Sequence, residues 1–181
     1  MNSNFARQSY FDDFESGAGF WFGGVTDDSD PAYGGVLGPF AGSGGAEIVT
    51  RTYDLMSGYD SAVIEFDLHA IDSWDNEEFI MFVDGSPISS HSFNWQSSGV
   101  TNSWTATGGN YAVTIEPSGT RGNIGYNPGW VDQSFTVRVV VTDPGPSMSV
   151  GFGSTTNQNI YDESWAVDNV AVTSTNDPSQ I

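Results

Sequence analysis

Two stretches of the chain alternate between core-type and polar residues, and this period of two indicates strands with one buried face. In the first stretch, Ala62, Ile64, Phe66, Leu68 and Ala70 share one face, and Val63, Glu65, Asp67 and His69 share the other. Phe135, Val137, Val139 and Val141 repeat the pattern. Leu, a strong helix former, occurs only at three positions, whereas β-branched and aromatic residues are frequent. The chain is therefore predicted to be all-β.

Further short strands are expected between segments rich in Gly, Ser, Asn and Pro. The run from Phe79 to Val83 ends in Asp84-Gly85, a dipeptide that favours a tight hairpin. The other expected strands are residues 10–15, 19–22, 47–53, 111–116, 148–152 and 165–173. Roughly ten such strands predict an antiparallel two-sheet β-sandwich of jelly-roll type with long calcium-binding loops. We expect one module over residues 1–181, excised from a much longer chain, with functional loops at 23–45 and 93–110.

The charge balance excludes several partners. The chain has 23 acidic residues against four Arg and no Lys, which gives a net charge of −19. Binding to nucleic acid or to an anionic membrane needs clustered basic residues, and no apolar run is long enough to span a bilayer. A compact domain with this charge repels itself unless cations bind to it. We therefore expect an extracellular, calcium-rich setting.

Acidic residues gather in four loop-like segments beside Gly, Ser and Asn. These segments hold Asp12, Asp13 and Glu15; Asp27, Asp28 and Asp30; Asp72, Asp75, Glu77 and Glu78; and Asp162, Glu163 and Asp168. All of them except Asp12 are predicted calcium ligands, because Ca²⁺ prefers oxygen ligands in flexible loops. A solvated acidic surface is the alternative for any single segment. None of the four matches the regular twelve-residue calcium loop.

The sequence contains few features that indicate a transition-metal site or an enzyme active site. The chain has no Cys and only two His residues, His69 and His91, which are not spaced as a transition-metal pair. No Gly-x-Ser-x-Gly motif is present. Two carboxylates can hydrolyse a glycosidic bond, but 23 acidic residues single out no such pair. The chain is expected not to be an enzyme.

Large aromatic side chains near loops are the candidate ligand-binding residues. Trp21 and Trp165 fit the core, while Trp74, Trp95, Trp104 and Trp130 lie in or beside loops. An exposed indole ring either anchors its own loop or contacts a ligand. We predict ligand contacts for Trp74, Trp95, Tyr126 and Trp130, with residues 126–130 as the leading segment.

Two terminal motifs resemble a known family. Phe11-Asp12-Asp13-Phe14-Glu15-Ser16-Gly17 and residues 162–170, Asp-Glu-Ser-Trp-Ala-Val-Asp-Asn-Val, are similar to the paired end strands of calcium-stabilised jelly-roll modules. The resemblance implies that Glu15 and Asp168 share one structural calcium ion. Residues 66–85 resemble modules of the very large repeats-in-toxin (RTX) adhesins of bacteria. Within those adhesins the most similar module is the peptide-binding one, which is implied to hold a partner's free C-terminus through calcium.

These observations predict a non-catalytic, monomeric, calcium-dependent adhesion module on a cell surface, whose partner is the C-terminal end of a peptide or protein. One alternative is a calcium-dependent carbohydrate-binding module, in which Trp and Tyr rings stack on sugars. The other is a structural spacer that calcium only stiffens.

Overall fold

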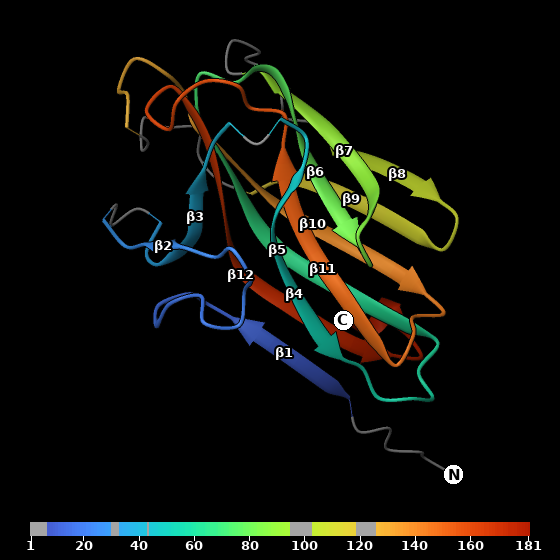
Figure 1. The fold of residues 1–181 in the computed structure, drawn as a ribbon. Helices are drawn as coiled ribbons and strands as arrows, with labels where there is room; N and C mark the ends of the chain where they lie inside the picture. The colour runs from blue at the N-terminus through green and yellow to red at the C-terminus, as the bar shows by residue number, and fades with distance from the viewer. Residues whose placement is uncertain (1–6, 30–32, 43, 95–102, 119–125) are drawn as a thin grey trace.

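The computed structural model describes residues 7–29, 33–42, 44–94, 103–118 and 126–181. Two antiparallel sheets pack face to face around a shared core (Figure 1). Within the described ranges the one helical element is a 3-10 turn, Pro178–Gln180, and no helix there is long and apolar enough to cross a membrane. The prediction of an all-β, two-sheet sandwich of jelly-roll type is confirmed.

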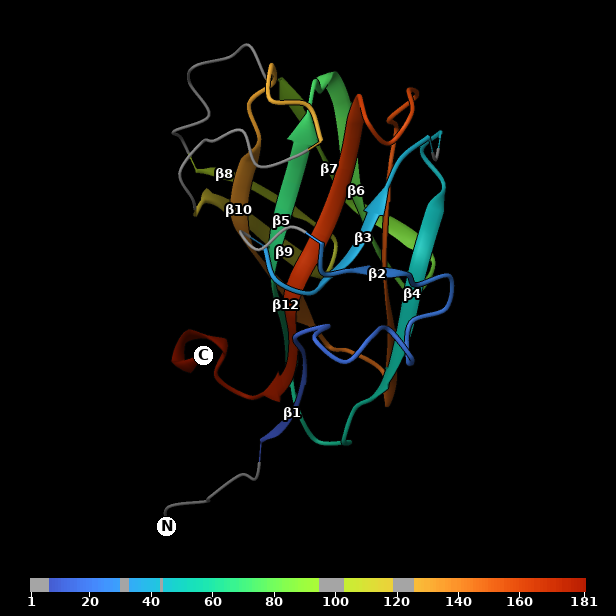
Figure 2. The ribbon, with the colours of Figure 1, turned by 90° about the vertical axis from the view of Figure 1, so that its left-hand side faces the viewer.

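The sheets differ in size. The larger has the order β2-β3-β12-β5-β10-β9-β8, with β1 also paired to β12, and the smaller has the order β4-β11-β6-β7. The strands of the larger sheet are β1 (Gln8–Asp12), β2 (Thr26–Asp27), β3 (Val36–Phe40), β5 (Ser61–Asp72), β8 (Trp104–Gly108), β9 (Tyr111–Pro117), β10 (Gln133–Thr142) and β12 (Glu163–Thr175). Those of the smaller sheet are β4 (Glu47–Asp54), β6 (Asp75–Val83), β7 (Ser86–Asn94) and β11 (Ser147–Ser154). Figure 2 shows β5 and β12 on one side of the molecule and β4 on the other.

The two alternating stretches form neighbouring strands, β5 and β10. Their apolar faces are in register, with Phe135 opposite Leu68 and Val137 opposite Phe66. Aromatic rings then join the two sheets: Phe152 of β11 lies 4.7 Å from Phe66, and Phe79 of β6 lies 5.2 Å from Trp165 of β12, measured between ring centroids. The core therefore forms where the period-two pattern predicted it.

Several strand boundaries differ from the prediction. Residues 19–22 form turns in which only Phe22 bridges to Thr50 of β4, while Trp21 enters the core as expected. Strand β1 stops at Asp12, and Phe14 has φ 55°, outside the extended region. The predicted Asp84-Gly85 hairpin is confirmed, because both residues have positive φ, 51° and 72°. The expected loops 23–45 and 93–110 contain β2, β3 and β8.

Three connections meet at the end of the sandwich that is uppermost in Figure 1. Strand β5 ends there, β6 and β12 begin there, and residues 126–132 lead into β10 at the same place. Ser73 N–H donates to the Asp162 carbonyl at 2.7 Å, which links the β5–β6 hairpin to the turn before β12. Residues far apart in the sequence are thus brought together at this end.

The joined aromatic core gives a direct stability prediction. Phe152→Ala removes a fully buried ring that contacts Trp21, Phe66 and Phe79, and it should lower the free energy of unfolding by about 3–5 kcal/mol. Phe22→Ala is the matched control, because that ring is 82% exposed, and its effect should stay within about 0.5 kcal/mol. Urea unfolding followed by Trp fluorescence measures both. Equal midpoints for the two variants would contradict the packing described here.

Candidate functional site

The carboxylate of Asp72 links two of these three connections, the end of β5 and the segment of residues 126–132. Its two oxygens accept hydrogen bonds from the backbone N–H groups of Tyr126, at 3.1 Å, and Asn127, at 3.0 Å. Its own N–H donates to Asp132 Oδ1 at 2.7 Å. Asp72 is 1% exposed and has φ 65°, a strained backbone conformation for a residue other than Gly. The end of β5 is therefore fixed against the segment that carries Tyr126.

Two exposed tyrosines lie next to each other above this connection. Tyr126 is 39% exposed and Tyr161 is 65% exposed, with ring centroids 5.2 Å apart and planes at 84°. The Tyr126 hydroxyl donates to Asp27 Oδ2 at 3.1 Å, and the Ser73 hydroxyl donates to Asp162 Oδ1 at 2.7 Å. We call Tyr126, Tyr161, Asp27, Asp72 and Asp162 the tyrosine site. It presents aromatic rings and hydrogen-bond acceptors together.

The electrostatics of the tyrosine site are negative. Burial raises the pKa of Asp72 to about 6; the Asn127 and Tyr126 N–H groups oppose the shift, and the charges of Asp132 and Asp162 add to it. Burial and the bond to Asp27 raise the pKa of Tyr126 to about 12.

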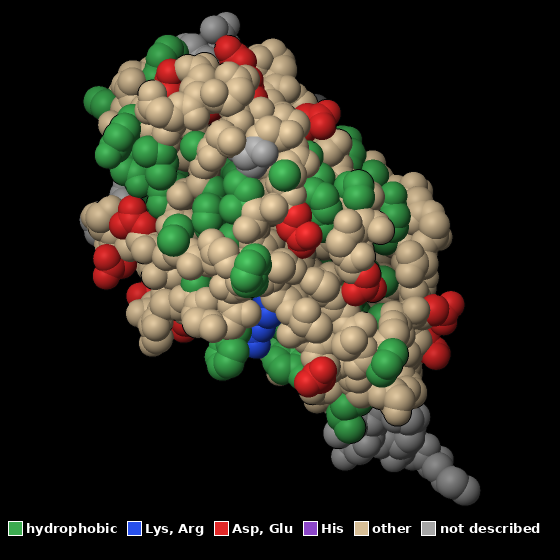
Figure 3. Space-filling model, in the orientation of Figure 1, with side chains coloured by type: hydrophobic (Ala, Val, Ile, Leu, Met, Phe, Trp, Pro, Cys, Tyr) green, Lys and Arg blue, Asp and Glu red, His purple; other side chains and the backbone are tan. Residues whose placement is uncertain are grey.

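Asp27 keeps its charge, because hydrogen bonds from Ser29 and then from Tyr126 lower its pKa. Both ion pairs within the described ranges, Arg51–Asp12 and Arg138–Glu65, lie elsewhere. On the face in Figure 3, acidic side chains are widespread and basic atoms are seen at one point. The tyrosine site therefore suits ligands that donate hydrogen bonds.

A second acidic group lies where the first and last strands meet. Asp168 of β12 is opposite Asp67 of β5 and is 9% exposed. Burial raises its pKa to about 6, and the charges of Asp67, Glu15 and Asp13 add to the shift. We call these four carboxylates the end-strand group. Glu15 also accepts the Gly35 N–H at 2.9 Å, and Asn169 Nδ2 donates to both Asp67 and Asp168 at 3.0 Å.

The end-strand group brings Glu15 and Asp168 into one neighbourhood, and it adds Asp67, which the sequence analysis did not select. In the part of the chain that the structure describes, no three acidic or histidine side chains converge closely enough to hold a metal ion. Calcium binding therefore stays a prediction.

The other predicted ligands serve mostly local bonds. The buried Glu77 accepts the Asp75 N–H at 2.6 Å. A side-chain hydrogen bond with Glu77 and the charge of Glu77 raise the pKa of the exposed Asp75. Glu163 is fully buried, and its Oε1 accepts the N–H groups of residues 157 and 158 at 2.6 and 2.7 Å. Asp28 is exposed, and Asp30 lies outside the described residues.

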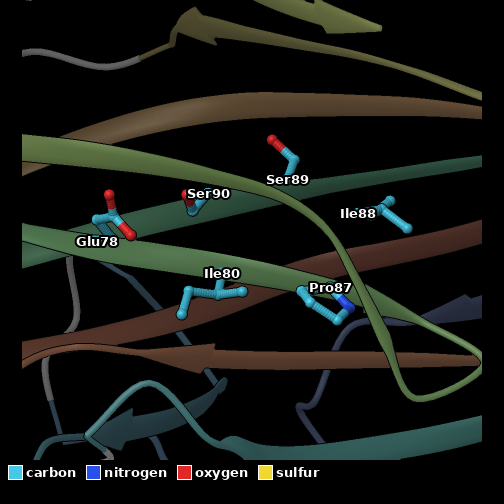
Figure 4. A pocket seen from close by; sticks show the side chains of 6 residues that line it. All are labelled: Glu78, Ile80, Pro87, Ile88, Ser89 and Ser90. Atoms are coloured by element: carbon cyan, nitrogen blue, oxygen red, sulfur yellow. The ribbon is translucent and has the colours of Figure 1, made fainter. Parts of the chain in front are cut away.

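Glu78 lines a separate cavity of about 350 Å³ between β6 and β7, with Ile80, Pro87, Ile88, Ser89 and Ser90 (Figure 4). No aromatic ring lines this cavity. It is therefore a weaker candidate for sugar stacking than the tyrosine site.

The aromatic residues that were predicted to bind ligand differ in how exposed they are in the structure. Trp74 is 1% exposed, and its indole N–H donates to the Ser164 carbonyl at 2.7 Å, so the structure corrects its assignment to a ligand surface. Trp130 is half-buried, and Trp95 lies outside the described residues. Tyr126 lies at the exposed loop end as expected. Tyr161 was missed, because a lone Tyr between Asn-rich and acidic residues carries no local signal.

Comparisons with known proteins give fold-level neighbours only. No family model matches the chain, and a search of curated proteins finds no match. One similar solved structure is the C-terminal family 6 carbohydrate-binding module of a marine laminarinase from Zobellia galactanivorans (12% identity, 92% of this chain and 99% of that chain, TM-score 0.37). Another is a family 27 carbohydrate-binding module that recognises mannan (14% identity, 93% and 98% covered, TM-score 0.45). A third is dimeric latent PorU from Porphyromonas gingivalis (14% identity, 94% and 13% covered, TM-score 0.39).

The raised pKa of Asp168 predicts a pH effect on stability. Its value of about 6 in the folded chain, against an ordinary 3.8, means that the folded protein binds this proton more tightly. The contribution of Asp168 to stability therefore falls as pH rises from about 4 to 6. Asp72 acts in the same sense. Buried His69, with a pKa lowered to about 4, acts in the opposite sense up to its ordinary 6.5.

Because these effects overlap, the informative quantity is the difference between Asp168→Asn and the parent in excess chelator. The variant should gain stability relative to the parent as pH rises from about 4 to 6, because Asn cannot ionise. Urea unfolding at several pH values gives this difference. A difference that does not change with pH would show that Asp168 titrates at its ordinary pKa.

Proposed function

We propose that this chain is a non-catalytic carbohydrate-binding module and that the tyrosine site holds the sugar. The observation that carries the proposal is the exposed pair of Tyr126 and Tyr161 rings beside carboxylate acceptors. Aromatic faces pack against the C–H faces of sugar rings, and a few well-placed polar groups then fix orientation. The carboxylate of Asp27 and the Tyr126 hydroxyl can bond sugar hydroxyl groups at the edge of this surface.

The charge at the tyrosine site favours a sugar over the C-terminus of a peptide. A free carboxylate would approach Asp27, Asp72 and Asp162, which repel it, with no described basic side chain in the site to offset the cost. A bound metal ion would be needed to reverse that sign. Hydroxyl groups donate hydrogen bonds to carboxylates without such an ion, so a polyhydroxyl ligand fits the site as it stands.

Calcium has a separate, structural place in the proposal. The end-strand group consists of the carboxylates of Asp13, Glu15, Asp67 and Asp168, and carboxylate oxygens are ligands that Ca²⁺ prefers. Because no three acidic side chains among the described residues converge closely enough to hold an ion, these carboxylates would have to move closer together when calcium binds. Burial raises the pKa of Asp168, and the negative charges of Asp67, Glu15 and Asp13 add to the shift. A bound calcium ion would neutralise them and tie β1 to the centre of the larger sheet. Extracellular fluid, which is rich in calcium, is the setting in which we expect the module to work.

The tyrosine pair is tested by replacing each ring. Tyr126→Ala and Tyr161→Ala should each weaken binding to a glycan identified on an array by about 5- to 30-fold, because each removes a stacking surface worth about 1–2 kcal/mol. Isothermal titration calorimetry measures the loss. Phe20→Ala is the matched control, since its ring is 78% exposed but lies beside Arg51, away from the site.

Two outcomes would refute the proposed function. One is the absence of any glycan ligand for the folded parent protein. The other is binding of peptides with free C-termini, lost on amidation and on addition of chelator, which would support the calcium-dependent peptide module instead.

Calcium should stabilise the folded protein at neutral pH. We expect millimolar calcium to raise the melting temperature in low salt and Asp168→Asn to abolish the increase, because ligand binding to the folded state alone adds to stability. Glu116→Gln, at an exposed position of β9, controls for loss of one negative charge. An equal increase in parent and Asp168→Asn would place the ion elsewhere.

A further inference from the structure

Resting on the proposed function, we infer that the sugar at the tyrosine site carries a protonated amino group, as in a glucosamine oligomer, and that acidic sugars are rejected. The inference concerns the ligand's charge. It follows from what surrounds the exposed Tyr126 and Tyr161 rings and from where the described basic residues lie; Arg121 falls outside the described residues.

The donors around the site are neutral. Asp27 accepts hydrogen bonds from Ser29 and the Tyr126 hydroxyl, and Asp162 accepts one from the Ser73 hydroxyl. Asp72 accepts two backbone N–H groups. Neutral donors use part of the acceptor capacity of these carboxylates and leave their charges in place. The rim of the tyrosine pair therefore carries negative charge that no basic side chain among the described residues cancels.

The described basic residues lie away from the tyrosine site, and two of them form ion pairs. Arg51 is paired with Asp12 beneath the Phe20 ring, and Arg138 is paired with Glu65 on the β10–β5 face. Arg7 directly precedes β1, at the opposite end of the molecule from the tyrosine site. The sequence contains no Lys. A cation supplied by the ligand would thus meet no competing side chain among these residues.

The rings themselves add to this preference. A cation over the face of a Tyr ring is attracted by the ring's quadrupole. Donation of the Tyr126 hydroxyl to a charged Asp27 moves electron density toward the ring. The perpendicular arrangement also leaves two faces at right angles, so one sugar can pack on one face while its ammonium group approaches the other. The aromatic rings and the carboxylates thus both favour a positively charged ligand.

The test compares tetrasaccharides of equal length that differ in charge. Glucosamine, N-acetylglucosamine, glucose and glucuronate oligomers are titrated into the folded module by calorimetry, below the pKa of the sugar amine. We expect the glucosamine oligomer to bind at least tenfold more tightly than the neutral pair and the glucuronate oligomer not to bind. The glucosamine affinity should also fall more steeply with added sodium chloride than the neutral affinities do.

Two variants connect the preference to named residues. Asp27→Asn and Asp162→Asn keep a side-chain oxygen as a hydrogen-bond acceptor but remove one charge each, so each should reduce the ratio of glucosamine to N-acetylglucosamine affinity by about threefold or more. Glu116→Gln removes a charge from exposed β9 and should leave that ratio unchanged.

Each outcome can be read separately. Binding of none of the four oligomers by the parent, if glycan arrays also show no ligand, would refute the proposed function. Equal binding of neutral and amino sugars, or tighter binding of glucuronate, would overturn the charge inference and leave the sugar site standing. A blocked lysine tetramer that binds more tightly than the glucosamine oligomer would overturn it in favour of a protein ligand.

Discussion

The buried carboxylate of Asp72 is the interaction on which the loop end depends. It terminates β5, which lies between β12 and β10 in the larger sheet, and it accepts the N–H groups of residues 126 and 127. Together with the bonds from the Asp72 N–H to Asp132 and from the Tyr126 hydroxyl to Asp27, these two bonds fix Tyr126 at the end of β5. The positive φ of Asp72 and its raised pKa both cost stability. Strained backbone conformations cluster at functional sites, and this agrees with our placing the ligand site here, beside the exposed tyrosine pair.

The core and the loop end are connected through the same strands. Phe66 and Trp165, whose rings join the two sheets, lie on β5 and β12, and these strands lead directly to Asp72 and to the turn that carries Tyr161. The exposed tyrosine rings contribute little to that core. Ligand preference can therefore change through Tyr126 and Tyr161 while the sandwich stays intact.

Local patterns predicted the architecture, whereas the site required long-range contacts. Alternation identified β5 and β10, and Asp84-Gly85 identified a hairpin, because both signals lie within a few neighbouring residues. Trp74 was predicted to contact ligand because it lies in or beside a loop, but its ring is buried and its indole N–H bonds the Ser164 carbonyl. Asp27, Tyr126 and Tyr161 are brought together only by the pairing of distant strands, and neither composition nor spacing contains that information.

Carboxylates lie close together in two regions of this chain, the tyrosine site and the end-strand group, and the donors around them differ. At the tyrosine site, backbone and hydroxyl donors from two connections, the β5–β6 hairpin and the segment that carries Tyr126, bond the carboxylate oxygens and leave their negative charges in place. In the end-strand group, Asp67 and Asp168 lie directly opposite each other on paired strands and share one amide donor, Asn169. Opposed like charges destabilise a sheet. We therefore propose that a cation relieves this repulsion at the end-strand group, whereas at the tyrosine site the ligand would supply the positive charge.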